Sequence, residues 1–190
     1  MKRIVIFASG SGTNAENLIQ YFNQKKEVSV VQVLTNNPHA KVIDRCNNLK
    51  ISCLSFNRTA FYVENHILAI LKTINPDVIV LAGFLWKFPE SILKEFPNKV
   101  INVHPALLPK YGGKGMYGMR VHEAVVYNHE KETGITIHYV NEHYDEGAII
   151  FQASCTVGSN DTAATVAEKI HKLEMEHFPR VVESFLFPKE

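Results

Sequence analysis

The fold of this chain is indicated by the stretch Ile4-Val5-Ile6-Phe7-Ala8-Ser9-Gly10-Ser11-Gly12-Thr13-Asn14. Its first five residues form a continuous apolar run, as in a parallel strand that is buried on both faces. The glycine-rich residues that follow predict a tight turn. Apolar residues then recur at helical spacing, at Ala15, Leu18, Ile19 and Phe22. The stretch therefore predicts a strand, a turn and a helix in direct succession.

The rest of the chain alternates short apolar runs with helical stripes. Strands are expected at residues 28–34, 51–54, 78–82, 100–103, 134–140 and 148–154. Helices are expected around Val42 and Cys46, over residues 59–73, 90–96 and 119–128, and from Asp161 onward. Repeated strand and helix units favour an α/β fold with a doubly wound, mostly parallel sheet. The alternating polarity of the last two strands predicts an antiparallel C-terminal edge, and a C-terminal helix follows it.

Length and composition narrow the class of protein. The 190 residues suffice for one hydrophobic core, so we expect a single domain, 1–190. A formal net charge of +1 disfavours a nucleic-acid partner, which needs a basic surface. No stretch has the length of a membrane helix, and residues 1–8 are too short for a signal peptide, so we expect a cytoplasmic protein. The three cysteines lack metal-ligand spacing, which favours reduced thiols and no metal.

The turn at residues 9–14 is a candidate anion site. Its glycines let the backbone approach a ligand, and the N–H groups and dipole of the following helix favour negative charge. The turn lacks the third glycine of a dinucleotide fingerprint and the lysine of a Walker loop, so a single phosphate is the better fit. The alternative is an ordinary turn in which Thr13 or Asn14 caps the helix.

A second candidate site is the stretch Asn102-Val103-His104-Pro105-Ala106-Leu107-Leu108-Pro109-Lys110. Side chains alternate along a strand, so Asn102 and His104 share one side. Pro105 ends the pairing of the strand, which puts His104 at the carboxyl end, where open α/β sheets bind their ligands. The alternative is a structural pair, with His104 bound to a backbone carbonyl.

Three further features lie outside these two stretches. Asp145 stands in a loop between the last two strands, where a carboxylate beside an imidazole would orient it for proton transfer; by itself, Asp followed by Gly is ordinary turn chemistry. Residues 112–118 hold four of the ten glycines, which favours a mobile flap over a disordered surface loop. Glu174 continues the core stripe of the last helix and needs a polar partner if it faces inward. Of the remaining histidines, we expect the following to lie at the surface or at helix ends: His122, His129, His143 and His171.

At these residues the chain resembles the folate-dependent formyltransferase family, and within it the phosphoribosylglycinamide formyltransferases of purine synthesis. The turn Ser-Gly-x-Gly-[Ser/Thr]-Asn is typical of the purine enzymes, and Asn-x-His-Pro-x-Leu-Leu-Pro with a later Asp-x-Gly is typical of the wider family. The resemblance extends nearly from end to end. The matching segments are Ser9–Asn14, Leu81–Phe84, Asn102–Lys110, Gly134–His138, Asp145–Gly147 and the last helix.

This resemblance implies a Rossmann-like formyltransferase fold and a reaction. The amine of glycinamide ribonucleotide would take the formyl group of 10-formyltetrahydrofolate, a cosubstrate, and no metal would be needed. By match to the motifs, the catalytic residues would be Asn102, His104 and Asp145, and the ribonucleotide would bind to Gly12, Thr13, Asn14 and Glu174. The folate would contact Leu85, Val140, Asn141 and Tyr144, while Thr136 would hold an ordered water. Residues 1–100 would bind the phosphate, residues 101–190 would supply catalysis and the folate site, and the enzyme would be a monomer or a homodimer.

The sequence departs from the family pattern at three places. Trp86 and Lys87 replace a common arginine and an aliphatic residue, the loop 112–120 is longer than usual, and His171 replaces a Gln or Lys near the phosphate. One rival interpretation is a formyltransferase of the same family whose acceptor is methionyl-tRNA or an amino sugar nucleotide. Another is a formyltetrahydrofolate hydrolase, for which water is the acceptor. The expected absence of a further domain disfavours the tRNA enzyme and the hydrolase. A third alternative is a non-enzymatic phosphate or folate sensor. Such a sensor would not need all three catalytic residues, so their presence disfavours it.

Overall fold

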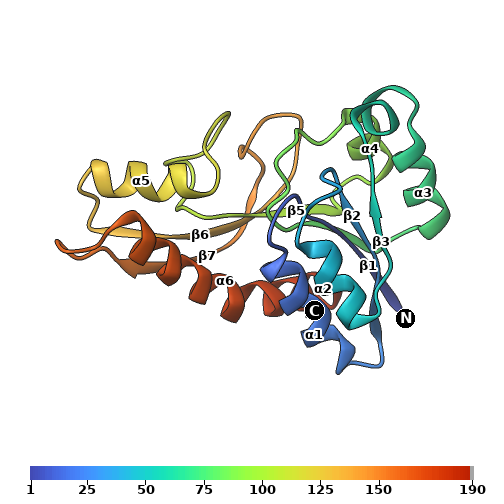
Figure 1. Cartoon of the computed structure of the whole chain (residues 1–190), viewed down its shortest axis with the longest axis horizontal. Coiled ribbons are helices and arrows are strands. Elements are labelled where there is room, and N and C mark those ends of the chain that lie inside the picture. The colour runs from blue at the N-terminus through green and yellow to red at the C-terminus, as the bar shows by residue number, and fades with distance from the viewer. Residues whose placement is uncertain (189–190) are drawn as a thin grey trace.

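The computed structural model of the protein describes residues 1–188 and contains one seven-stranded sheet in the order β3-β2-β1-β4-β5-β6-β7 (Figure 1). Strands β1 to β5 pair in parallel, while β6 pairs antiparallel with both β5 and β7. The predicted fold class, a mostly parallel sheet with an antiparallel C-terminal edge, is therefore confirmed. The strands are β1 (Lys2–Phe7), β2 (Val28–Thr35), β3 (Cys53–Ser55), β4 (Val78–Leu81), β5 (Val100–His104), β6 (Glu132–Tyr139) and β7 (Ile149–Thr156).

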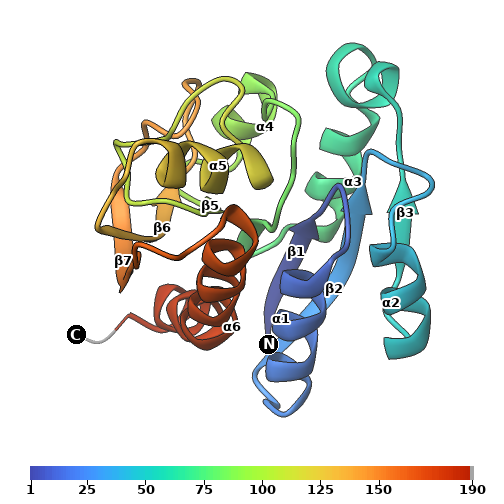
Figure 2. The ribbon, with the colours of Figure 1, turned by 60° about the vertical axis from the view of Figure 1, so that its left-hand side comes forward.

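Helices cover both faces of the sheet. They are α1 (Thr13–Asn23), α2 (Val42–Leu49), the π-helical turn η1 (Thr59–Val63), α3 (His66–Ile74), α4 (Glu90–Glu95), α5 (Met119–Tyr127) and α6 (Ala163–Leu186). Successive residues of β1 point to opposite faces of the sheet. Ile4 and Ile6 pack in the core under α1, α2 and α6. Val5 and Phe7 pack in the core under η1, α3 and α4. This two-sided burial explains the continuous apolar run of the first strand. Figure 2 shows α1 and α6, from the two ends of the chain, lying side by side.

The helix expected over residues 59–73 is interrupted. A π-helical turn ends at Val63, and α3 starts only after Asn65, whose φ of 55° lies in the left-handed region. Asparagine adopts this conformation more readily than most residues, so the chain changes direction here although the apolar stripe continues. The prediction of one helix was wrong because the stripe records which side chains are buried and not whether the backbone is continuous.

The pairing of β5 with β6 determines which side chains meet at the site. Asn102 lies opposite His138, and His104 lies opposite Thr136. Gly134 lets β7 approach, because a Cβ atom there would lie 2.0 Å from the carbonyl oxygen of Ala153. The antiparallel addition of β6 and β7 therefore brings a second row of polar residues to the end of β5.

Candidate active site

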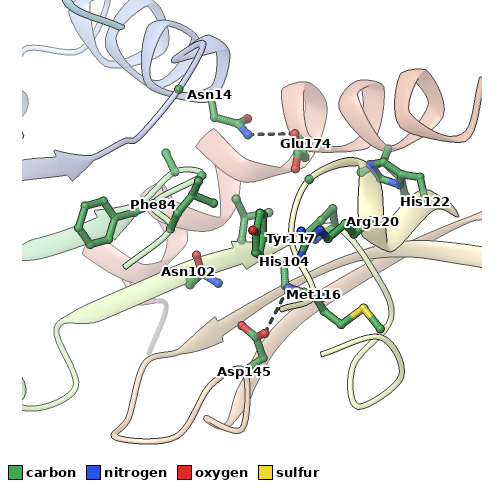
Figure 3. Close-up of a pocket in the computed structure, with 18 of the residues that line it drawn as sticks. Asn14, Phe84, Asn102, His104, Met116, Tyr117, Arg120, His122, Asp145 and Glu174 are labelled. Atoms are coloured by element: carbon green, nitrogen blue, oxygen red, sulfur yellow. Dashed lines mark hydrogen bonds and ion pairs between the residues drawn. The ribbon is translucent and has the colours of Figure 1, made fainter. Parts of the chain in front are cut away.

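A pocket of about 700 Å³ opens at the edge of the sheet where the parallel strands end (Figure 3). Its walls come from the segments that follow β1 and β4, from the end of β5, from a glycine-rich loop and from α6; these segments are 10–14, 82–85, 102–105, 113–118 and 167–174. The volume suits a small-molecule site, and carboxyl ends of strands are where open α/β sheets bind ligands. Residues from both halves of the chain therefore line one pocket.

Residues 9–14, which we call the anion loop, present backbone to this pocket. Gly12 is the N-cap residue of α1, with φ 74° and ψ 19°, and no side chain caps the helix. A Cβ atom on Gly12 would lie 2.5 Å from Cβ of Val42, so α2 leaves no room for a larger residue. The alternative of capping by Thr13 or Asn14 is excluded, and the first N–H groups of α1 stay available to an anion.

Asn14 and Glu174 join the two ends of the chain across the pocket. The side-chain amide of Asn14 donates a hydrogen bond to Oε2 of Glu174 at 2.9 Å, as Figure 3 shows. Glu174 therefore faces inward, with only 14% of its side chain exposed. The polar partner that an inward-facing Glu174 requires is Asn14. Oδ1 of Asn14 is buried with no partner in the described residues, and so is left for a ligand donor. His171 also lines the pocket, and Glu174 raises its pKa by hydrogen bonding.

His138 fixes the side chain of Asn102. Its Nδ1 lies 2.8 Å from the carbonyl oxygen of Tyr139, which only accepts, so this nitrogen carries the proton. Nε2 of the neutral ring therefore accepts a hydrogen bond from Nδ2 of Asn102 at 3.1 Å. Burial lowers the pKa of His138, which favours this neutral form. One N–H of the Asn102 amide remains for a ligand. His138 was not among the residues predicted for the site, although its position opposite Asn102 follows from the strand register.

His104 and Asp145 come together from separate segments. The ring of His104 is almost fully buried, and its Nε2 donates to the carbonyl oxygen of Tyr111 at 2.7 Å. Its Nδ1 lies 3.6 Å from Oδ2 of Asp145, and the other carboxylate oxygen lies 3.7 Å from Nε2 of His138. The separation between His104 and Asp145 is slightly longer than a hydrogen bond, as is common before a substrate tightens a catalytic site. Nε2 of the neutral His138 ring and the carboxylate oxygen both only accept, so they form no hydrogen bond with each other. We call Asn102, His104, His138 and Asp145 the polar cluster.

Two glycines hold Asp145 in place. Gly147 lies flat against β6, because a Cβ atom there would lie 1.7 Å from the carbonyl oxygen of Tyr139. Asp145 itself has φ 58°, so the loop turns sharply just before this contact. The backbone N–H of Gly113 donates to Oδ2 of Asp145 at 2.9 Å. The spacing Asp-x-Gly therefore has a physical reason: only glycine fits against the strand two residues after the carboxylate.

The residues expected to contact folate lie in two places. Leu85 and Tyr144 line the large pocket, whereas Val140, Asn141 and Tyr144 line a small adjoining cavity of about 60 Å³. Thr136 lines neither. Its hydroxyl donates to the carbonyl oxygen of Ala106 and accepts from the backbone N–H of Leu108 and from the Gln152 amide. These three bonds use the whole hydrogen-bonding capacity of a hydroxyl, which differs from the expected role of holding a water.

The prediction that His122 lies at the surface was wrong. It is buried on α5 and lines the pocket, and its Nδ1 has no partner in residues 1–188. Burial lowers the pKa of its ring. Val121 and Val125 are buried on the same helix, so the apolar stripe of α5 was the signal that marked this side as internal.

Trp86 and Lys87 do not line the large pocket, but both line the small adjoining cavity. Trp86 packs against Tyr62, and the guanidinium of Arg58 lies 4.6 Å from the centre of the Trp86 ring. The carbonyl oxygen of Lys87 accepts a hydrogen bond from the Tyr62 hydroxyl at 2.7 Å. An aromatic group with a cation over its ring therefore occupies this position.

Among the described residues, no group of three or more His, Cys, Asp or Glu side chains is placed to hold a metal ion. Within 1–188, no helix has both the length and the apolar character required to cross a bilayer.

A doubly wound sheet that gathers a backbone anion loop and an amide, imidazole and carboxylate cluster into one pocket is typical of enzymes acting on small anionic molecules. The family model described as formyl transferase matches residues 2–182. The chain therefore belongs to the formyl transferase family.

Individual relatives agree with this assignment. The phosphoribosylglycinamide formyltransferase of Bacillus subtilis is 33% identical, over 98% of this chain and 95% of that protein. The crystal structure of the enzyme of the same name from Bacillus halodurans has a TM-score of 0.88 at 33% identity and covers 100% of this chain and 97% of its own. Glycinamide ribonucleotide transformylase 1 from Geobacillus kaustophilus has a TM-score of 0.88 at 32% identity, with 98% and 99% coverage. A chloroplastic relative from Arabidopsis thaliana is longer, since this chain spans 63% of it.

Proposed function

We propose that this protein transfers the formyl group of 10-formyltetrahydrofolate to the amine of glycinamide ribonucleotide, giving formylglycinamide ribonucleotide and tetrahydrofolate in purine synthesis. The observation that carries this proposal is the convergence of the polar cluster and the anion loop on one pocket, with His104 and Asp145 3.6 Å apart. The names of the relatives support the acceptor and the transferred group, and the family resemblance of the sequence suggests the folate donor. We further propose that the anion loop binds the phosphate and that Glu174 contacts the ribose.

The residues of the polar cluster suit formyl transfer. Attack of an amine on a formyl carbon places negative charge on the carbonyl oxygen, and correctly placed donors stabilise that charge by about 3 kcal/mol each. Asn102 has one amide N–H free for this oxygen, because His138 holds the other. The imidazole of His104 supplies a second donor once substrate replaces its contact with Tyr111. Asp145 then holds the ring and helps to move the proton from the attacking amine to the leaving folate nitrogen.

The cosubstrate is a reduced folate with an extended, mostly apolar body. Beside the polar cluster, the pocket offers Phe84, Leu85 and Tyr144, together with backbone from residues 82–85. Apolar walls with a few oriented polar groups are what small-molecule sites commonly provide. We propose that the pteridine lies on this side, against Val140 and Asn141, and that the ribonucleotide lies on the side of α1 and α6. Both partners are small molecules.

The test is an assay of the purified protein with glycinamide ribonucleotide and 10-formyltetrahydrofolate, followed by the absorbance of the released folate. We expect turnover that depends on both substrates. His104→Ala should lower kcat by at least about 10³-fold, because it removes both an oxyanion donor and a proton carrier. His66→Ala is the matched control, since 64% of that side chain is exposed on α3. Equal turnover by the His104 variant and the control would rule out the mechanism.

A further inference from the structure

Arg45 on α2 contacts the anion loop without belonging to it. Its Nε donates a hydrogen bond to the carbonyl oxygen of Ser11 at 2.8 Å, and its Nη1 pairs with the carboxylate of Glu16 in the first turn of α1. On the same helix, the backbone N–H of Val42 donates to the carbonyl oxygen of Gly10 at 3.2 Å. Two successive carbonyl groups of the loop are therefore tied to α2.

These two contacts determine where the loop N–H groups point. In a trans peptide the C=O of one residue and the N–H of the next point in opposite directions. Because the carbonyls of Gly10 and Ser11 face α2, the N–H groups of Ser11 and Gly12 face away from it. Both residues line the pocket, and neither N–H donates a hydrogen bond within residues 1–188. Two donors thus remain unused at the place where an anion would bind.

We propose that Arg45 is a positioning residue for the phosphate of the acceptor substrate. Its guanidinium holds the Ser11 peptide so that the Gly12 N–H faces the pocket, and it neutralises Glu16, a carboxylate close to the anion site. Nothing in this role requires contact between Arg45 and the substrate. The inference rests on the proposed function, because it assumes a phosphorylated acceptor.

A purely structural role makes a different prediction. The side chains of Arg45 and Glu16 are 32% and 28% exposed, and ion pairs near the surface commonly add little to stability. If the pair only joined α1 to α2, its loss would lower thermal stability slightly and affect all substrates alike. A positioning role affects only the substrate that carries the phosphate.

The experiment compares Arg45→Gln and Arg45→Lys with the wild type, using glycinamide ribonucleotide and its dephosphorylated riboside as acceptors. For Arg45→Gln we expect the KM for the ribonucleotide to rise about tenfold, the worth of one charge-assisted hydrogen bond. The kcat, the KM for the folate and the kinetics with the riboside should stay unchanged. For Arg45→Lys the KM for the ribonucleotide should lie between those of the wild type and Arg45→Gln. An ammonium group keeps the charge but does not reproduce the paired contacts of the guanidinium.

Lys41→Gln serves as the control for a lost positive charge, because Lys41 is exposed at the start of the same helix. It should leave the KM for the ribonucleotide unchanged. An equal loss with both acceptors, a KM unchanged in Arg45→Gln, or an equal change in Lys41→Gln would overturn the proposal. If the wild type formylates neither acceptor, the proposed function fails instead. Calorimetric titration with inorganic phosphate then tests positioning alone, with about tenfold weaker binding expected for Arg45→Gln and equal binding overturning it.

Discussion

The anion loop and the polar cluster belong to one pocket but are built in different ways. The loop is continuous in sequence, offers backbone groups to a ligand, and depends on Gly12, where an added Cβ atom would lie 2.5 Å from Cβ of Val42 on α2. The cluster is made of side chains from β5, β6 and the loop before β7, and each of these side chains is held by a partner from another segment. The proposed function therefore assigns binding and chemistry to separate parts of the fold.

The two regions should therefore be sensitive to different substitutions. A backbone site tolerates many side-chain changes but fails when a Cβ atom or a φ angle does not fit. A cluster of side chains is less sensitive to small backbone changes, but it loses its activity when one functional group is removed. If the comparison holds, changes in the loop should alter KM for the phosphorylated substrate, and changes in the cluster should alter kcat.

Apart from His104→Ala, the largest effect should come from the carboxylate of the cluster. Asp145→Asn keeps the shape of the side chain and an acceptor for the Gly113 N–H, but removes the charge that faces His104. We expect kcat to fall by about 10²–10⁴-fold, the usual contribution of a group that moves protons in the transition state. Steady-state kinetics should show the KM for glycinamide ribonucleotide within about threefold of wild type. A raised KM with normal kcat would place Asp145 in binding and break the comparison.

A smaller effect should come from the loop. Gly12→Ala places a Cβ atom against Val42 and forces alanine to a φ of 74°. The left-handed conformation alone costs about 1–2 kcal/mol, so we expect the KM for the ribonucleotide to rise about tenfold or more while kcat changes little. Gly158→Ala is the control, because Gly158 does not line the pocket and a Cβ atom there would meet only Oδ2 of Asp161, at 3.6 Å. Equal kinetics for the two variants would contradict a precise backbone site.

The smallest effect concerns stability against pH. Burial lowers the pKa of His122 and of His138 below that of an unfolded histidine, about 6.5, so both rings add stability above this pH and lose it as the pH falls through their folded pKa. Glu174 raises the pKa of His171, which acts in the opposite sense. Urea unfolding should show a loss of stability from pH 7 to pH 5 that is smaller in His122→Gln and unchanged in the exposed control His39→Gln. The same loss in His122→Gln as in wild type would show that this burial does not govern the acid response.

The local features were the predictable ones. Strand and helix patterns around residues 4–22 follow from apolar periodicity, and the anion loop follows from its glycines. Features that depend on distant partners were not accessible in the same way. Asn14 meets Glu174 across 160 residues, and periodicity alone gives no such pairing.

Histidine shows the same limit most clearly. His122 was expected at the surface, because an imidazole is compatible with either side of a helix and only its apolar neighbours marked the buried side. His138 was not singled out, because its role comes from lying opposite Asn102 in a strand pair. Thr136 was expected to hold a water, yet the loop after β5 and Gln152 of β7 use its whole hydroxyl.

The most direct measurement is a single turnover with enzyme in excess over 10-formyltetrahydrofolate, in the presence of glycinamide ribonucleotide, with every product quantified. Our account predicts equal amounts of tetrahydrofolate and formylglycinamide ribonucleotide. Tetrahydrofolate accompanied by free formate would mean that water is the acceptor, and that result would contradict transfer to the amine.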